Sequence, residues 1–279
     1  MRLLQWPFVA VMVLAIPLVL GQGCPPSASE PEPQYTQADL TDVEKSAVDS
    51  VVEACAALAQ STSMAQNAAD DTTSPNGRTF GTCPVVTTGL ATEGEGNLTV
   101  DLNMDFGAGC APLEGYACSG SASGTFTQFS RHIGLAFNNI TCNADTLAGT
   151  ADVTYSITSA GVGLVGQFNL TWVSGTDSIA TSGNGSYNYH RGAAASTITT
   201  FDGSITDSNG TYTVNLADVV VSYTNNAVLI PSAGVSTLTQ PNGPIRRISV
   251  RFNSTSPATG DVEVSINGSE FFPVNIYTL

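Results

Sequence analysis

The chain has 279 residues, of which 42% are hydrophobic and only 11% are charged. This hydrophobic content is enough for a folded core, so the composition excludes a largely disordered chain. The 23 acidic residues outnumber the 8 basic ones, and the formal net charge of −15 makes nucleic acid and anionic lipid headgroups poor partners. Lys45 is the only lysine, which leaves almost no candidate for amine chemistry.

Residues 1–23 are predicted to be a signal peptide. Arg2 is followed by the apolar run "WPFVAVMVLAIPLVL", which is 15 residues long, and then by small residues and Cys24. A helix needs about 20 apolar residues to cross a bilayer. Because this run is shorter and contains two prolines, a transmembrane helix is not expected.

Cys24 stands directly after the expected cleavage point, with Gly23 before it. This arrangement resembles the lipobox of bacterial lipoproteins, in which the cysteine is acylated and becomes the mature N-terminus. The resemblance implies lipidation of Cys24. Pro25 in place of an aspartate implies the outer membrane or the cell surface, with the folded domain in the periplasm or outside. The alternative is cleavage near Gly23 that releases a soluble secreted protein.

Residues 24–38 are predicted to be a lipid-anchored tether. The stretch "PPSASEPEPQ" is rich in proline, acidic and free of apolar periodicity, which is typical of an extended, semi-rigid spacer. Such a spacer lets a folded domain stand off a membrane surface.

An amphipathic helix is predicted at about residues 41–66. Thr41 and Glu44 have the spacing of a capping box, in which each side chain satisfies a backbone N–H at the helix start. An apolar stripe at helical spacing follows, so we expect a surface helix with one buried face. The stripe consists of Val43, Ala47, Val51, Cys55 and Leu58, widened by Val48 and Val52.

Beyond about Cys83 the apolar period changes from 3.6 to 2, which predicts β-strands. The clearest runs alternate at residues 98–106, 168–172, 248–252 and 262–266. The chain is therefore predicted to be mainly β, a long antiparallel meander that forms a curled sheet, a sandwich or a partial barrel. The helix is expected to pack on the apolar face of this meander, so that residues 39–279 form a single β-rich domain.

Turns are predicted where glycine and asparagine cluster beside these runs. The segment "GVGLVG" matches the glycine pattern of dinucleotide-binding loops, but no helix signature follows it, so it is also interpreted as a turn. The other predicted turns are "EGEGN", "SGNGS", "FDGS", "DSNGT", "PNGP" and "INGS".

The stretch "DLNMDFGAGC" begins like a calcium loop of the D-x-N-x-D type. Such a loop needs glycine at its sixth position and glutamate at its twelfth, whereas Phe106 and Pro112 stand there. The favoured interpretation is the polar face of a strand. No metal is expected, and the weak candidates for one are Asp101, Asn103 and Asp105.

Five cysteines remain besides Cys24, and hairpin geometry suggests how they pair. Facing residues of a hairpin have a constant sum of numbers, so each disulfide predicts the position of its turn. A bridge between Cys83 and Cys110 places a turn near residues 96–97, and one between Cys118 and Cys142 centres on Ser130. Both turns coincide with suitable sequence, and an exported compartment permits disulfides.

Cys55 is left over in this scheme and is expected to be a buried thiol on the apolar stripe. The alternative scheme joins Cys55 to Cys83, which ties the helix to the sheet, and Cys110 to Cys118, which closes a short loop.

The segments "CPVVTTG", "DFGAGC" and "GYACSGSASGTF" are similar to a pattern in β-rich bacterial lipoproteins. In that family an aspartate, a phenylalanine, a glycine and a cysteine close a strand. Here the corresponding residues are Asp105, Phe106, Gly107 and Cys110. The resemblance implies an architecture and no particular activity.

No catalytic constellation is recognisable along the chain. His132 and His190 are the only histidines, and each stands beside an arginine in a predicted loop, which is a poor basis for a catalytic triad or a zinc site. No cofactor is expected, and a non-enzymatic role is favoured.

The leading hypothesis is an exported, lipid-anchored envelope protein with a structural or binding role, whose partners are the membrane and a glycan or lipid ligand. One alternative is a carrier of a hydrophobic ligand, which needs an empty apolar space between helix and sheet. Another is a carbohydrate-binding or carbohydrate-active protein; as an enzyme it needs two facing carboxylates about 5–10 Å apart.

Overall fold

The computed structural model describes residues 35–73, 84–89, 92–94, 97–113, 116–158, 161–190, 195–222 and 229–279. Residues Tyr35–Leu279 form one structural unit. Its helical elements are η1 (Gln37–Asp39), α1 (Asp42–Thr73), α2 (Ser256–Thr259) and η2 (Ile276–Thr278). Its strands are β1 (Val85–Thr88), β2 (Thr92–Gly94), β3 (Asn97–Asp105), β4 (Cys110–Leu113), β5 (Tyr116–Thr127), β6 (His132–Cys142), β7 (Asp145–Thr158), β8 (Gly161–Ser174), β9 (Asp177–His190), β10 (Ala195–Asp207), β11 (Gly210–Ser222), β12 (Ala233–Thr239), β13 (Ile248–Phe252), β14 (Asp261–Ile266) and β15 (Phe272–Asn275).

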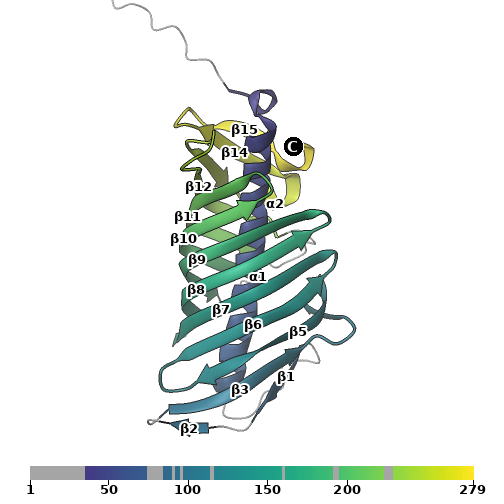
Figure 1. Ribbon diagram of the computed structural model, residues 1–279, viewed down its shortest axis with the longest axis vertical. Helices are drawn as coiled ribbons and strands as arrows, with labels where there is room; N and C mark the ends of the chain where they lie inside the picture. The colour runs from purple at the N-terminus through teal and green to yellow at the C-terminus, as the bar shows by residue number, and fades with distance from the viewer. Residues whose placement is uncertain are drawn as a thin grey trace, which may run out of the picture. The chain divides into compact units, whose positions relative to one another are not determined.

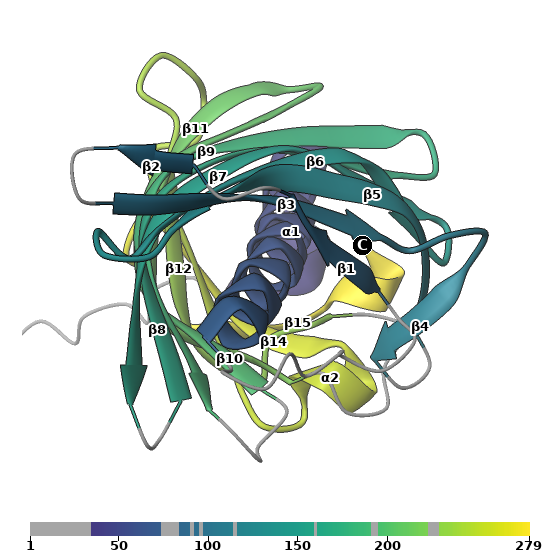
Figure 2. The same ribbon diagram turned by 90° about the horizontal axis from the view of Figure 1, so that it is seen from below.

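The strands form a single antiparallel meander that does not close. Strands β1, β3 and β5 to β15 pair in chain order, and the short strands β2 and β4 pair with β3 and β5. In the described part of the chain, β1 and β15 each pair with one strand only and are the two edges of the sheet. The prediction of a mainly β meander is confirmed, and the form it takes is a curled sheet (Figures 1 and 2).

Helix α1 runs along the inside of this curled sheet, from the β15 end to the β3 end (Figure 1). The predicted capping box is present: the backbone N–H of Thr41 donates to the Glu44 carboxylate at 2.8 Å, and the N–H of Glu44 donates to the Thr41 hydroxyl at 3.3 Å. In the described part of the chain, no helix is both long and apolar enough to span a bilayer.

The helix is enclosed more completely than its apolar stripe predicted. Every residue from 54 to 62 is buried, including Gln60, which lies on the helix face opposite the apolar stripe and was expected to be exposed. The prediction of a surface helix with one buried face is therefore wrong for this part. The physical reason is the size of the side chains: five of these nine residues are alanine or serine, so the sheet approaches the helix from several sides (Figure 2).

The core is one continuous cluster of helix and sheet side chains. The alternation predicted for 98–106 is present where the strand is best defined, since Leu102, Met104 and Phe106 are buried. Asp101, Asn103 and Asp105 lie exposed on the other face of β3, where the strand interpretation places them.

Three of the predicted turns are wrong. The segments "SGNGS" and "FDGS" lie inside β9 and β10, and "GVGLVG" opens β8. Their glycines serve a close approach of neighbouring backbones instead: Gly183 faces Gly203, and a Cβ built on Gly203 would lie 2.8 Å from the Cα of Gly183 and collide with the carbonyl oxygen of Ser182. Glycine inside a strand marks such approaches and tight bends.

Other predicted turns are where the sequence placed them. The segments "DSNGT", "PNGP" and "INGS" form the β10–β11, β12–β13 and β14–β15 connections. The sheet also contains register shifts in several strand pairs, between β5 and β6 and between β11 and β12 among others, and such bulges add bend and twist.

A disulfide joins Cys118 to Cys142, which face each other on β5 and β6, as the hairpin sum predicted. The amide of Gln60 on α1 donates to the sulfur of Cys142. The alternative pairing of Cys110 with Cys118 is thereby ruled out, and Cys55 is a buried free thiol. Cys83 lies outside the described residues, so its pairing with Cys110 stays a prediction.

Candidate functional site: an acidic groove

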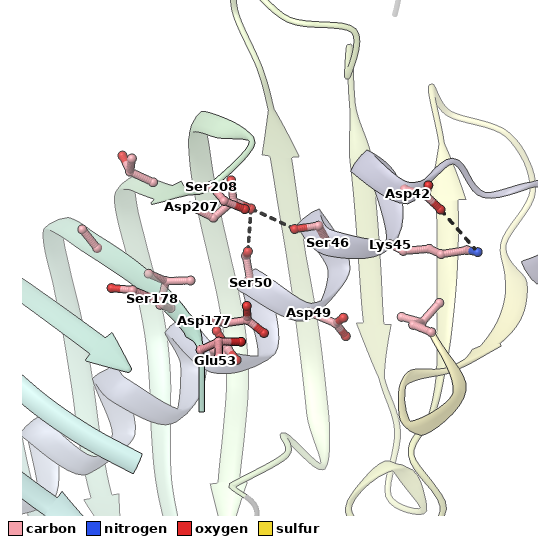
Figure 3. Close-up of a pocket in the computed structure, with 15 residues that line it drawn as sticks. Asp42, Lys45, Ser46, Asp49, Ser50, Glu53, Asp177, Ser178, Asp207 and Ser208 are labelled. Carbon is pink, nitrogen blue, oxygen red and sulfur yellow. Dashed lines mark hydrogen bonds and ion pairs between the residues drawn. The ribbon is translucent and has the colours of Figure 1, made fainter. Parts of the chain in front are cut away.

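A groove of about 700 Å³ opens between the first turns of α1 and one rim of the sheet (Figure 3). The rim contributes the β8–β9 turn, with Thr176 and Asp177, and the β10–β11 turn, with Asp207 and Ser208. Leu279 also lines the groove. The volume falls in the range of small-molecule sites.

The helix side of the groove is one polar stripe. Its six residues stand at positions i, i+3, i+4, i+7, i+8 and i+11, which share a single face of a helix. The opposite face of the same turns carries the buried Ala47, Val48 and Val51, so the core fixes the direction in which the polar stripe points. The stripe residues are Asp42, Lys45, Ser46, Asp49, Ser50 and Glu53.

The rim side is held by its turns. Asp207 accepts hydrogen bonds from the backbone N–H groups of Asn209, at 2.7 Å, and Gly210, at 3.0 Å. Gly210 has a φ of 133°, which permits the tight turn. The second carboxylate oxygen of Asp207 faces the helix and accepts hydrogen bonds from the hydroxyls of Ser50, at 2.8 Å, and Ser46, at 3.3 Å (Figure 3). Helix and rim are thus joined across the groove at Asp207.

Two carboxylates of the groove, those of Asp49 and Glu53, are destabilised in their charged form. Burial, followed by the charge of Asp177, raises the pKa of Asp49 to about 6, although part of its side chain is exposed. Burial, followed by the charges of Asp177, Asp49, Asp145 and Asp207 in that order, raises the pKa of Glu53 to about 7. Negative charge is therefore concentrated here beyond what the groove itself neutralises.

Positive charge is scarce in the groove. Lys45 lies 4.0 Å from Asp42 at one end. Elsewhere in the described part of the chain, the Arg251–Glu263 ion pair and the His132–Asp152 contact involve no residue that lines the groove. Asp49, Glu53, Asp177 and Asp207 consequently have no cationic partner among the described residues.

The groove is not arranged as a metal centre. Within the described ranges, no group of three or more His, Cys, Asp or Glu side chains has the geometry to hold a metal ion. What the groove offers is a set of acceptor oxygens, from carboxylates on both sides and from the hydroxyls of serine and threonine, to a ligand that donates hydrogen bonds and carries positive charge.

The residues singled out from the sequence do not form this site. Asp101, Asn103 and Asp105 lie on the exposed face of β3, and Cys118 and Cys142 form a structural disulfide. Cys24 lies outside the described residues. His132 opens β6 and not a loop, and it lies 2.7 Å from Asp152; His190 ends β9.

Two signals in the sequence pointed to the groove and were missed. One is the polar stripe of the helix, which has the same period as the apolar stripe. The other is an aspartate beside alternate hairpin turns, since Asp145, Asp177 and Asp207 recur at intervals of 32 and 30 residues. Because the chain makes two hairpins in each interval, it returns to the same rim of the sheet. The charges of all three aspartates raise the pKa of Glu53.

The chain matches no protein family model, no curated protein and no solved structure. The fold and the groove therefore define it only as an open antiparallel meander wrapped around a helix, with an acidic groove where the helix enters the sheet.

Proposed function

We propose that the chain is an exported, lipid-anchored protein of the cell envelope with a binding role, and that the acidic groove is its binding site for a positively charged ligand. The observation that carries the proposal is the set of carboxylates without a cationic partner, Asp49, Glu53, Asp177 and Asp207, on both sides of one groove. A cation between them relieves repulsion that the folded protein otherwise has to bear.

The signal peptide, the lipobox-like Cys24 and the tether support export and anchoring. The Cys118–Cys142 disulfide also supports an oxidising compartment, because disulfides persist outside the reducing cytosol.

The described interior speaks against a carrier of a hydrophobic ligand. An empty chamber that admits a water-sized sphere leaves accessible surface on the side chains that line it. Cys55, Leu58 and Ala65 of the helix have none, because the sheet packs directly on them. Ligand binding between helix and sheet therefore requires displacing the core.

A sugar is a poorer fit for the groove than a cation. Sugar rings are commonly bound against aromatic side chains, whose apolar faces pair with the C–H face of the ring. No described residue that lines the groove is aromatic. A neutral ligand would also leave the repulsion among the groove carboxylates uncompensated.

Anchoring is tested by mass and fractionation. We expect full-length protein from its native membrane to carry an acyl mass on Cys24. The Cys24→Ser variant should lose this mass and move to the soluble fraction, since stable anchoring depends on more than one acyl chain. An unmodified wild-type chain cleaved near Gly23 would contradict the anchor.

Ligand charge is tested by thermal unfolding of the full-length protein at pH 8. Small cationic compounds should raise Tm, because a ligand that binds only the folded state stabilises it, whereas neutral and anionic compounds of equal size should not. The double variant Asp49→Asn/Glu53→Gln should lose this response. The control variant Asp101→Asn/Glu270→Gln removes two charges from exposed positions outside the groove and should keep it. An equal response in both variants would show that the groove is not the site.

A further inference from the structure

Three cysteines lie side by side on the neighbouring strands β4, β5 and β6. Cys118 of β5 faces Cys110 of β4 on one side and Cys142 of β6 on the other. Directly opposed residues of an antiparallel pair point to the same face of a sheet, with their Cβ atoms about 4.5–5.5 Å apart. The three side chains therefore form a row on the inner face of the sheet, where Cys118 and Cys142 are buried and Cys110 packs against the core.

The middle cysteine of the row is bonded to only one of its two neighbours. Cys118 forms its disulfide with Cys142, and Cys110 is disulfide-bonded as well, with Cys83 as the partner that the sequence predicts. Cys118 and Cys142 are 1% and 0% exposed, whereas Cys110 is only half-buried. A small thiol in solution therefore reaches the bond of Cys110 before it reaches the bond between Cys118 and Cys142.

The row has the arrangement that thiol–disulfide exchange requires. In this reaction a thiolate attacks one sulfur of a disulfide, and the other sulfur departs as the leaving group. Because Cys118 stands between its two neighbours, a thiolate at Cys110 approaches the Cys118 sulfur from the side opposite to Cys142. The strand ladder holds attacking and leaving groups in place, so the step is intramolecular between positioned groups.

Helix α1 supplies a hydrogen-bond donor to the leaving sulfur. The side-chain amide of Gln60 donates to the sulfur of Cys142 and lies 3.9 Å from the sulfur of Cys118. A hydrogen bond to a charged group stabilises its charged form, so Gln60 favours the departure of Cys142 as a thiolate. Asp145 faces Cys142 from β7, and its carboxylate disfavours a lasting negative charge there. The released sulfur therefore ends as a protonated thiol, which is not a nucleophile.

We propose that Cys110, Cys118 and Cys142 form an internal thiol–disulfide exchange relay that responds to small thiols. Two molecules of a monothiol such as glutathione reduce the bond of Cys110 and are oxidised to their own disulfide. Cys110 loses its proton to solvent and forms a bond with the Cys118 sulfur, while the Cys118–Cys142 bond breaks and Cys142 takes up a proton. The disulfide thereby moves from the β5–β6 pair to the β4–β5 pair, and the sulfur that contacts Gln60 of the helix becomes a thiol.

The test is a disulfide map of the full-length protein after incubation at pH 8 with a series of glutathione concentrations. Exchange is stopped with acid, the protein is unfolded and alkylated with N-ethylmaleimide, and unreduced peptides are identified by mass spectrometry. We expect a species in which Cys110 is bonded to Cys118 and Cys142 is alkylated. The rate at which the Cys118–Cys142 bond is lost should stop rising with glutathione concentration, because the exchange step itself involves no glutathione.

Two matched variants isolate the attacking thiol. Cys83→Ser and Cys110→Ser both remove the predicted Cys83–Cys110 bond, but only Cys83→Ser keeps the thiol of Cys110. Cys83→Ser should form the Cys110–Cys118 bond without added glutathione. Cys110→Ser should lose the Cys118–Cys142 bond at least about tenfold more slowly than the wild type, in proportion to glutathione, because it lacks the positioned nucleophile.

Gln60→Leu, which keeps a side chain of similar size, tests the contribution of the helix. It should slow the exchange about fivefold, the effect of one hydrogen bond. An unchanged rate in this variant would overturn the role assigned to Gln60.

The relay itself is overturned if the wild-type map never shows alkylated Cys142 together with the Cys110–Cys118 bond; this result needs no variant to fold. It is also overturned if Cys83→Ser and Cys110→Ser lose the Cys118–Cys142 bond equally fast. Neither outcome bears on the proposed binding of a cationic ligand, because no cysteine lines the groove.

Discussion

Replacing Gly203 with alanine is expected to lower the free energy of unfolding by about 2–3 kcal/mol, the cost of forcing an added methyl group into packed structure. The Cβ would meet the carbonyl oxygen of Ser182 and the Cα of Gly183 on the adjacent strand, and also the buried ring of Phe201. Backbone atoms within a ladder cannot move aside without breaking the pairing of β9 and β10. Urea unfolding followed by circular dichroism measures the difference.

Gly134→Ala is the matched control. Gly134 also lies inside a strand, β6, but its Cβ would lie 3.6 Å from the Thr125 hydroxyl, which is an ordinary contact. At a compatible site, Gly→Ala commonly stabilises a protein by about 0.4–1 kcal/mol through the unfolded state. Equal stability changes in both variants would show that the close approach of β9 and β10 has no energetic weight.

Removing the two titrating groove carboxylates, as Asp49→Asn/Glu53→Gln, is expected to stabilise the protein at pH 8 by about 2 kcal/mol, after a discount for their contact with solvent. The two pKa values are raised to about 6 and about 7 from 3.8 and 4.5. The folded state therefore holds these protons more tightly than the unfolded state does. The stability they contribute is fully present below about pH 4 and is lost as pH rises through 6 and 7.

The measurement is the free energy of unfolding of variant and wild type at pH 4, 6 and 8. The difference should be near zero at pH 4, where the wild-type groups are protonated, and should grow with pH. The same groups face Asp145, Asp177 and Asp207 on the rim and Lys45 on the helix, and none of these is altered. The control Asp101→Asn/Glu270→Gln should show no such growth; a parallel rise in both would assign the effect to net charge.

Much of the fold follows from local sequence. The capping box at Thr41 sets the start of α1, and the alternation at Leu102, Met104 and Phe106 sets which face of β3 is buried. Such features depend only on neighbours in the chain. The sum rule for hairpins extended this to the Cys118–Cys142 pair, because a short turn links the two strands.

The wrong predictions concern turns and helix burial, which depend on contacts between residues far apart in the sequence. "DSNGT" and "SGNGS" carry the same asparagine–glycine signal, yet the first is a turn and the second is inside β9. What distinguishes them is the strand that lies opposite: Gly183 faces Gly203, which no local pattern reveals. The extent of helix burial has the same origin, since the sequence of α1 does not show how far the sheet curls.

The groove could be predicted only in part. The polar stripe from Asp42 to Glu53 is visible in the helix sequence once that stripe is sought. The stripe forms one side of a groove only because Asp177 and Asp207 lie opposite it. These two residues stand more than 100 positions further along the chain and reach the helix because the sheet curves around it.

The enclosed helix has a consequence for the order in which the molecule assembles. Helix α1 comes first in the chain, but strands β5 to β11, which contact it, come later. During synthesis its apolar and alanine-rich surface has no partner until most of the chain has followed. Contacts this distant in sequence form slowly and leave early segments open to aggregation. We therefore expect a newly made chain to be open to aggregation until strands β5 to β11 have followed the helix.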